Sequence, residues 1–440
     1  MGKKIVLFIF ICCLTYNVIA TEPSEVAVSR AELQRFATVI SDIKKHYVRP
    51  VSDEELFDNA IKGVVSGLDP YSAYFKGDKL KRVKMLMQGG TVEGIGVDLA
   101  PDNGWLKVTA IIDDTPAKKA GMEEGDVITK INDKPIKDLP LNKLSDLLIG
   151  SKGSKITLTI LPKNQHEPQT LTLIRDSIKI QMVKWGMLAP NYGYIRIALF
   201  QEQTSDDIEK AAAALTKAAK GGLYGVVIDL RNDPGGLFES AVQVANCFLD
   251  AGELKDNKLL VYTKGRNSER DVAAYATYGS FLPKVPIVVL INGGTASSAE
   301  IVAAALQDHK RAIIAGTHSF GKGLVQTVFY LDKESAIKIT TALYYTPLGR
   351  SIQGKGVIPD VIINDTEIPE NNQMLKPIGG EYLAAHTQNS NNSEITRQIY
   401  KILQSRQNDE LALAYKDYQL YEALHILEGM NYGRYKLRGK

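Results

Sequence analysis

Two runs of apolar residues, 225–230 and 286–292, constrain the fold of this chain more than any other feature. Each run is long enough for one strand, and each is followed by glycines and then by a helical pattern, from about Leu237 and from Ser297. Strands that are apolar on both faces are typical of sheets covered by helices. The segment 176–365 is therefore predicted to form an α/β core.

Residues 90–175 show a different pattern, with short runs rich in β-branched residues separated by turn signals. One helical stretch, 141–149, interrupts the runs. The expected strands are 96–99, 106–112, 127–131, 155–161 and 169–174. We expect a small independent β domain here, inserted before the α/β core.

The two ends of the chain are predicted to be mainly helical. In the region 21–89, Ser52 and Glu55 form the sequence signature of a capping box, followed by apolar residues at helical spacing. The region 366–440 begins with a polar linker and closes with helices over about 394–428. A length of 440 residues is consistent with such a multidomain chain.

The N-terminus has the pattern of a secretory signal. Lys3 and Lys4 precede the apolar run 5–14, and small residues end the pattern at Ala20. We expect residues 1–20 to be a signal peptide and the protein to be exported, to the periplasm or another extracytoplasmic compartment. An uncleaved membrane anchor is the alternative. The net charge of +3 gives no reason to expect nucleic acid as a partner.

The three cysteines exclude an intramolecular disulfide in a processed chain. Cys12 and Cys13 lie within the expected signal, which leaves Cys247 alone in an apolar helical stretch where burial is expected. Cysteine and histidine are not clustered at the spacing of a zinc site. The sequence therefore predicts neither a metal nor a cofactor.

The β domain contains a candidate binding nest at 93–99, where two glycines flank one apolar residue before a strand. Glycines let successive backbone N–H groups converge on one point, which suits a carboxylate. The nest residues are Gly94, Ile95, Gly96 and Val97, and the helix offers a pocket for an apolar side chain through Leu141, Leu144 and Leu148. A glycine bulge in a strand is the structural alternative.

Two further segments of this domain, 115–121 and 124–133, resemble a PDZ domain, and the resemblance covers about 90–162. It implies that the backbone N–H groups of Ile95, Gly96 and Val97 bind the terminal carboxylate of a peptide. That peptide would lie beside the following strand by β-augmentation.

Three glycine-containing blocks in the α/β core carry candidate catalytic groups: 229–236, 292–301 and 316–326. The first ends a buried strand, and its paired glycines, Gly235 and Gly236, expose backbone N–H groups of the kind that form an oxyanion hole.

Ser297 opens a helix in the second block and has two interpretations. With Glu300 three residues later it matches a capping box, which is a purely structural role. A helix N-terminus is also a favourable place for a nucleophile, because its partial positive charge stabilises a developing oxyanion. The N–H of Ser298 would then be an additional oxyanion donor.

A nucleophilic serine needs a base, and the third block supplies a candidate in Lys322. Glycines on both sides permit close packing, and burial lowers the pKa of a lysine. Gln326 follows at a spacing that places both side chains on one face of an extended segment. His309 and His318 are the alternative bases, and a surface lysine is the structural alternative for Lys322.

The three blocks, in this order, resemble the carboxyl-terminal processing peptidases, and the similarity covers about 30–365. The resemblance implies a crotonase-like α/β core and a serine-lysine dyad assisted by glutamine, here Ser297, Lys322 and Gln326. It implies protein substrates with exposed apolar C-termini.

This chain departs from the family pattern in three places. Asp233 stands where asparagine is common, Ile149 stands where a basic residue is frequent, and Ser298-Ala299 replaces Ala-Ser. The carboxylate of Asp233 is expected to alter the field near the oxyanion hole.

Two other function classes remain open at this stage. One is an inactive PDZ scaffold that binds tails without cutting them, and the other is an acyl-thioester enzyme such as a thioesterase or hydratase. An adaptor or activator protein and a homo-oligomer formed through the terminal helices are expected as partners.

Overall fold

The structure is a computed structural model of the 440-residue chain. It describes residues 28–366 and 412–438, except for 103, 112–114, 124, 138, 140–143, 145–146, 164, 166, 180–181 and 255–256. The expected signal peptide, linker and first part of the C-terminal helices lie outside the described residues. The chain divides into two compact units, 1–68 and 69–440, and each is described by itself.

The first unit contains two helices, α1 (Arg30–His46) and α2 (Asp53–Ser66). The Oγ of Ser52 accepts a hydrogen bond from the N–H of Glu55 at 3.1 Å, so the predicted cap at the start of α2 is confirmed. No residue of α1 is buried.

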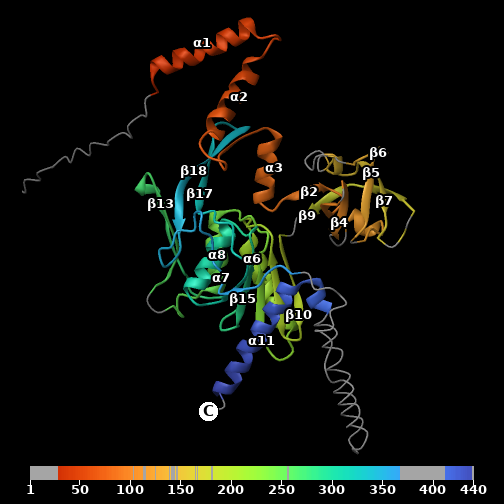
Figure 1. The fold of residues 1–440 in the computed structure, drawn as a ribbon, viewed down its shortest axis with the longest axis vertical. Helices are drawn as coiled ribbons and strands as arrows, with labels where there is room; N and C mark the ends of the chain where they lie inside the picture. The colour runs from red at the N-terminus through yellow and green to blue at the C-terminus, as the bar shows by residue number, and fades with distance from the viewer. Residues whose placement is uncertain are drawn as a thin grey trace, which may run out of the picture. The chain divides into compact units, whose positions relative to one another are not determined.

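The α/β core is built on a six-stranded sheet in the order β10–β11–β12–β15–β16–β19 (Figure 1). All neighbours run parallel except β10 and β11. The strands are β10 (Val183–Ala189), β11 (Tyr192–Ile197), β12 (Gly225–Asp229), β15 (Ile287–Ile291), β16 (Ile313–Gly316) and β19 (Val361–Ile362). The two apolar runs therefore form neighbouring central strands, as predicted.

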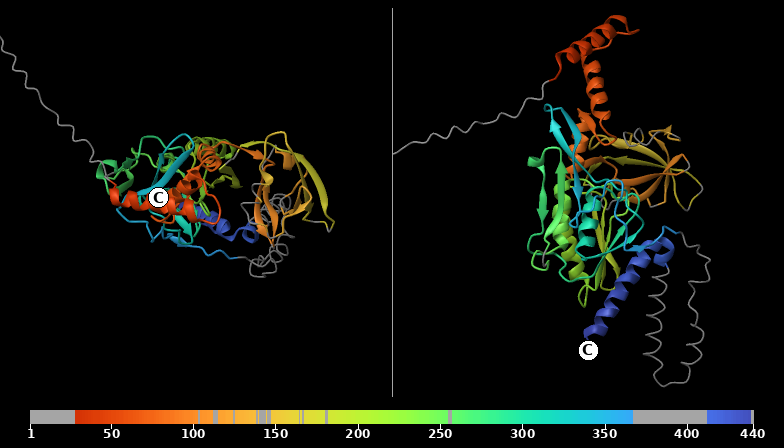
Figure 2. Two further views of the ribbon diagram at one scale, coloured as in Figure 1. Left: turned by 90° about the horizontal axis from the view of Figure 1, so that it is seen from above. Right: turned by 60° about the vertical axis from the view of Figure 1, so that its left-hand side comes forward.

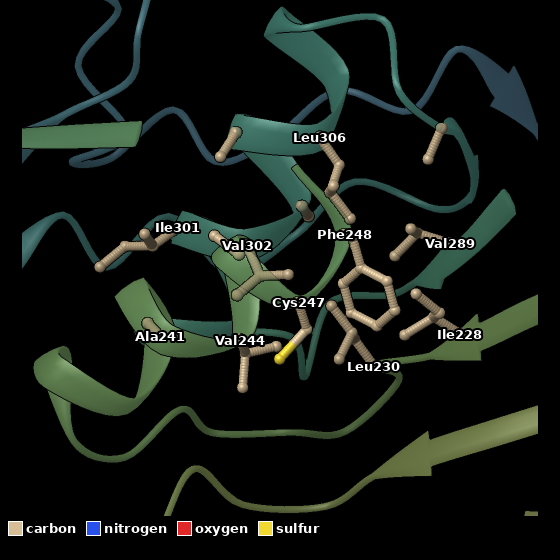
Figure 3. Close-up of a cluster of buried hydrophobic side chains, with 14 of the residues drawn as sticks. Ile228, Leu230, Ala241, Val244, Cys247, Phe248, Val289, Ile301, Val302 and Leu306 are labelled. Atoms are coloured by element: carbon tan, nitrogen blue, oxygen red, sulfur yellow. The ribbon is translucent and has the colours of Figure 1, made fainter. Parts of the chain in front are cut away.

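Helices cover both faces of this sheet. On one face, α6 (Thr204–Ala218), α7 (Phe238–Phe248) and α8 (Ser298–Asp308) pack on side chains such as Ile228 and Val289, and Figure 3 shows this cluster. On the other face, α11 (Tyr418–Arg438) packs on Val227 and Val288, and Figure 2 shows it lying along the sheet. Cys247 is buried in the first cluster, as expected.

A second sheet corrects one expectation. It has the order β1–β18–β13–β14, with β17 paired to β18. Its strands are β1 (Ala73–Lys76), β13 (Leu259–Gly265), β14 (Ala273–Tyr275), β17 (Leu324–Tyr330) and β18 (Ser335–Tyr345), and a 3-10 turn (Ser268–Arg270) precedes β14. The region up to residue 89 was expected to be mainly helical, and the expectation did not include the strand β1 within it. Pairing with β18 stabilises this four-residue strand, which is too short to show a period of its own.

Helix α3 (Asp78–Met87) follows β1 and is tied to the α/β core by main-chain groups at its end. The Leu86 carbonyl accepts a hydrogen bond from Nε2 of Gln201, and the Met87 carbonyl accepts one from the N–H of Glu202. This segment therefore reaches the core even though it precedes the β domain in sequence.

The β domain has the strand order β3–β4–β5–β7–β8, with β6 paired to β5. Its elements are β3 (Val97–Asp102), β4 (Trp105–Ile111), α4 (Pro116–Lys119), β5 (Val127–Ile131), β6 (Lys134–Pro135), β7 (Lys155–Leu161) and β8 (Gln169–Ile174). The five predicted strands are present, with bounds shifted by a few residues at most. Before and after the domain, β2 (Thr91–Gly94) and β9 (Asp176–Lys179) pair with each other, so its two chain connections form one antiparallel ribbon.

The C-terminal helix α11 extends to Arg438, ten residues beyond its predicted end at 428. Within the part of the chain that the structure describes, no helix is both long enough and apolar enough to cross a bilayer.

Candidate active site

Ser297, Lys322 and Gln326 line one cavity of about 580 Å³ in the second unit. Gly236 and Ser298 lie on the same wall. The rest of the lining is largely apolar and includes Phe75, Leu80, Val83, Leu199, Leu237, Phe238, Ile301 and Val328. The structure thus brings together residues from three blocks that are well separated in sequence.

Ser297 occupies a sharp turn between β15 and α8. Its φ of +54° is unusual for a residue other than glycine, and such angles persist only where the surroundings hold them. Its N–H donates to Oε2 of Glu300 at 2.9 Å. The turn places Ser297 at the N-terminus of α8, facing the cavity.

The carboxylate of Glu300 joins this turn to the loop that carries Lys322. It is fully buried, and besides the Ser297 N–H it accepts hydrogen bonds from Ser319 Oγ (2.5 Å), Gly321 N–H (2.7 Å) and Lys322 N–H (2.8 Å). The sequence identified Glu300 only as a capping and motif residue. Its second set of partners lies about 20 residues away, which local spacing does not reveal.

Tyr344 holds the same two segments through their carbonyl groups. Its hydroxyl lies 3.1 Å from the Ser297 carbonyl oxygen and 2.8 Å from that of Lys322. Burial, with a smaller contribution from the charge of Glu300, raises the pKa of Tyr344 well above its usual range, so the hydroxyl stays protonated and donates. Sequence reasoning missed this residue.

Lys322 is half-buried, and its Nζ donates to Oε1 of Gln326 at 3.2 Å. The amine also lies 4.7 Å from the ring centre of Tyr71. Burial lowers the pKa of Lys322, and the charge of Lys338 lowers it further, while Asp69 and Glu300 act in the opposite direction. The Nε2 of Gln326 is buried and has no hydrogen-bond partner among the residues that the structure describes.

Close packing at the Lys322 loop requires the flanking glycine that follows it. A Cβ on Gly323 would lie 2.5 Å from the backbone nitrogen of Gln353. The backbone at Gly323 therefore lies as close to a neighbouring segment as the glycines around Lys322 suggested.

The three expected oxyanion donors differ in their availability. The N–H of Gly235 donates to Oδ1 of Asp233 at 2.8 Å, so this donor is already engaged. The N–H groups of Gly236 and Ser298 have no hydrogen-bond partner among the described residues. A Cβ on Gly235 would lie 2.8 Å from the Ser298 nitrogen, so this glycine keeps the space beside that donor open.

Asp233 is wholly buried beside this pair of donors, and its Oδ2 has no partner in the described structure. Burial raises the pKa of Asp233 to about 8, against the opposing effects of the Gly235 hydrogen bond and the charge of Arg196. This shift favours an uncharged carboxyl at neutral pH, which would reduce the expected effect of Asp233 on the field near the oxyanion hole.

The alternative bases lie elsewhere. Nε2 of His309 is 2.7 Å from the Leu259 carbonyl oxygen, and Nδ1 of His318 is 2.9 Å from that of Ser319. Neither histidine lines the cavity.

In the β domain, the candidate nest residues fall into different environments. Gly94 ends β2 opposite Asp176, and Ile95 is buried in the domain core. Gly96 has a φ of +82°, and a Cβ there would lie 2.3 Å from the Cβ of Thr115. Val97 begins β3.

The described pocket residues of the β domain are Leu144, which is buried in the domain core, and Leu148, which packs against it. Leu141 lies outside the described residues. The guanidinium of Arg175 donates to the carbonyl oxygens of Leu147 and Leu148 at 3.0 and 2.9 Å. Ile149, at the position where the resembling family often has a basic residue, is exposed.

Family models match three parts of the chain. Residues 191–363 match peptidase family S41, residues 107–162 match the PDZ domain, and residues 14–79 match the N-terminal domain of the activating protease CtpB. The chain is 41% identical over 340 residues to a carboxy-terminal-processing protease of Bartonella bacilliformis, covering 77% of this chain and 76% of the relative.

This chain belongs to the carboxy-terminal processing proteases of peptidase family S41. It is a serine peptidase with a PDZ domain. The peptidase is also 35% identical to carboxy-terminal processing protease CtpA of Bacillus subtilis, over 74% of this chain and 67% of the relative. Its fold resembles a solved structure from Bacteroides fragilis described as a candidate S41 protease, with a TM-score of 0.52, 18% identity, and coverage of 84% and 97% of the two chains.

Among the residues described for this peptidase, no group of histidine, cysteine, aspartate or glutamate has a geometry that would hold a metal ion.

Proposed function

We propose that this peptidase cleaves peptide bonds with Ser297 as nucleophile and Lys322 as general base. The neutral Lys322 amine takes the proton of the Ser297 hydroxyl as the oxygen attacks the scissile carbonyl carbon. The resulting ammonium gives that proton to the leaving amine when the C–N bond breaks. Water then attacks the acyl-enzyme with Lys322 again as base, and the resulting ammonium returns the proton to Ser297 Oγ as the ester C–O bond breaks and the new carboxylic acid leaves.

The backbone donors of Gly236 and Ser298 stabilise the oxyanion in this proposal. Neither N–H group has a hydrogen-bond partner in the described part of the chain, and donors that are fixed in place stabilise charge in a transition state without reorganising. Gln326 orients the Lys322 amine through its Oε1, and its free Nε2 remains available to a substrate carbonyl.

One observation carries this proposal: the half-buried amine of Lys322 has no carboxylate partner within the described structure and is hydrogen-bonded only to a neutral amide, in the cavity that Ser297 lines. A lysine in this setting loses its proton more readily than one in water. A surface lysine or a structural ion pair would show neither feature.

Two variants test the assignment. Ser297→Ala and Lys322→Arg are expected to abolish cleavage of fluorescein-labelled β-casein, an unfolded protein, because one lacks the nucleophile and the other keeps its proton. Lys355→Arg is the matched control, since Lys355 also stands between two glycines but is exposed and outside the cavity. Near-normal cleavage by folded Ser297→Ala would show that Ser297 is only a helix cap, which contributes about 1 kcal/mol to the free energy of unfolding.

The PDZ domain captures the C-terminal tails of substrates in this proposal. The backbone at Ile95, Gly96 and Val97 turns into β3 through a left-handed glycine, a conformation that allows N–H groups to converge on a carboxylate. A fluorescent peptide with an apolar C-terminus is expected to bind, and its C-terminal amide to bind at least about tenfold more weakly. Equal affinity of the two peptides would exclude carboxylate capture.

An inactive tail-binding scaffold is not favoured, because such a protein has no need for Ser297, Lys322 and Gln326 in one cavity. The same casein assay distinguishes the two functions, since a scaffold binds without cutting.

Export and self-association complete the proposal. Residues 1–20 direct the chain out of the cytoplasm, and N-terminal sequencing of protein from the extracytoplasmic fraction is expected to begin near Thr21; a start at Met1 in the membrane fraction would indicate the anchor. The terminal helices mediate a homo-oligomer. In support, α1 exposes Leu33, Phe36 and Val39. Light scattering on the purified protein is expected to give a mass above that of one chain.

A further inference from the structure

A second lysine, Lys338, lines the same cavity as Lys322. It lies on β18, opposite Val328 of β17, and the next cross-strand pair on that face joins Thr340 and Gln326. Directly paired residues of antiparallel strands project from one face of the sheet. Lys338 therefore lies on the same face as Gln326, which holds the Lys322 amine.

Lys338 has no carboxylate in contact within the described structure. Its half-buried amine lies 5.7 Å from the ring centre of Phe75, and the exposed Lys79 lies 5.4 Å from the same ring centre. An aromatic face is a weak counterpart for a cation compared with a carboxylate. The positive charge of Lys338 is thus only partly compensated within the cavity.

Apart from the mutual repulsion with Lys322, the charged groups that act on Lys338 are Asp69 and Lys79. Burial and Lys79 lower the pKa of Lys338, while Asp69 raises it. Hydrogen bonds from Ser72 and from the N–H of Tyr71 outweigh burial and lower the pKa of Asp69, so this carboxylate is ionised. Of the Asp69 and Lys79 charges, Asp69 has the larger effect on Lys338.

Repulsion by Lys338 is the largest single charge effect on the Lys322 amine, and the attractions by Asp69 and by Glu300 are each smaller. When two ammonium groups share a half-buried site, the group with less compensation loses its proton more readily. These directions favour Lys338 as the group that keeps its proton and Lys322 as the group that gives its proton up.

We propose that Lys338 is a positioning residue for catalysis, whose fixed positive charge keeps the Lys322 amine neutral and ready to act as base. This inference rests on the proposed role of Lys322. It assigns to Lys338 no contact with the reacting atoms; its effect passes through the charge state of Lys322 alone.

The pH dependence of cleavage tests this role. In Lys338→Met, the ascending limb of kcat/KM for fluorescein-labelled β-casein is expected to move to higher pH. At pH 7, kcat/KM falls about three- to tenfold, and the plateau at high pH is kept. Lys338→Arg retains the charge and is expected to keep the wild-type profile. Lys79→Met, which removes a charge beside the same ring, is the matched control and leaves the profile unchanged.

A second measurement does not depend on cleavage. Trace acetylation of Lys322, quantified by mass spectrometry across pH in the Ser297→Ala background, reports its neutral fraction. Lys338→Met is expected to lower this labelling at pH 7 by a similar factor, and Asp69→Asn to raise it. If Lys338→Met leaves both the profile and the labelling unshifted, or lowers kcat/KM equally at all pH values, the inference is overturned. Activity in Lys322→Arg would overturn the base assignment instead, while the labelling still reports on Lys338.

Discussion

At the residue scale, the two oxygens of Glu300 divide their partners between the two segments of the site. Oε2 accepts from the N–H groups of Ser297 and Lys322, and Oε1 accepts from Ser319 and Gly321. Both oxygens of Glu300 accept hydrogen bonds. A glutamine in this place would direct its NH2 group toward N–H or O–H donors and would lose those bonds. The carboxylate thereby holds the backbone of nucleophile and base in one arrangement.

Glu300→Gln is accordingly expected to lower kcat/KM by about tenfold or more and the free energy of unfolding by about 2 kcal/mol. Glu202→Gln is the control, because Glu202 lines the same cavity but is exposed. Casein cleavage and urea unfolding measure the two effects. Unchanged activity in Glu300→Gln would show that the carboxylate does not position the dyad.

Asp233 gives a prediction with a defined pH dependence. Its folded-state pKa of about 8 lies above the ordinary value of 3.8, so between these values the folded chain holds a proton that the unfolded chain has released. Stability therefore falls as pH rises through this range, by up to about 1.4 kcal/mol per pH unit, and levels off above it. Asp233→Asn removes this dependence and keeps an uncharged side chain of similar shape.

The variant is expected to gain stability over the wild type between about pH 5 and about pH 8, and to keep near-normal activity at neutral pH. Urea unfolding of both proteins across this range measures the difference. Parallel stability curves would mean that Asp233 is ionised at neutral pH, with Arg196 as its compensating charge.

At the scale of elements, helix α11 is joined to the end of β12 by one arginine. The guanidinium of Arg231 donates to Asp229 at 2.7 Å and to Asp417 at 2.6 Å, just before α11 begins. Asp229 is buried and directly precedes the loop that carries Gly235 and Gly236. The C-terminal helix therefore packs on the sheet and also supports the strand that leads into the candidate oxyanion hole.

Asp417→Asn is expected to lower the free energy of unfolding by about 1–3 kcal/mol. Amide exchange is expected to speed up more in α11 than in the other helices. Lys416→Gln removes the neighbouring exposed charge and is the control. Hydrogen exchange followed by mass spectrometry resolves the helix. Exchange that speeds equally in all elements would indicate that α11 unfolds only with the whole core.

At the scale of the whole molecule, the PDZ domain is inserted through the ribbon of β2 and β9, where Gly94 pairs with Asp176. The ends of the domain are thus adjacent, and a two-residue Asn-Gly turn is able to close the ribbon once residues 95–175 are removed. This design keeps both connecting strands and is preferable to a bulky residue at Gly96, which would clash with Thr115.

Without the domain, cleavage of casein carrying an apolar C-terminal tail is expected to fall at least about tenfold. Hydrolysis of a small activated ester at Ser297 should be kept. If tailed casein is cut as fast as by the full chain, the domain does not capture tails for cleavage.

Much of the site was predictable from the sequence because its signals are local. Central strands that are buried on both faces appear as continuous apolar runs, and turns that approach other backbone segments require glycine, as at Gly235 and Gly323. The three blocks and their order indicated the family, and the spacing of Lys322 and Gln326 predicted the pair that the structure joins by a hydrogen bond.

Other features depended on the tertiary structure. Glu300 and Tyr344 bind segments about 20 to 50 residues away, β1 forms only because β18 offers it an edge, and Lys338 acts on Lys322 across two strands. The charge of Asp233 is not a property of its position in the chain, since burial raises its pKa against the opposing effects of the Gly235 hydrogen bond and the charge of Arg196. The sequence by itself determined which groups are present and how neighbours are spaced. Folding decided which groups lose water and which charges meet, because desolvation and electrostatic interaction depend on distances in space that sequence separation does not set.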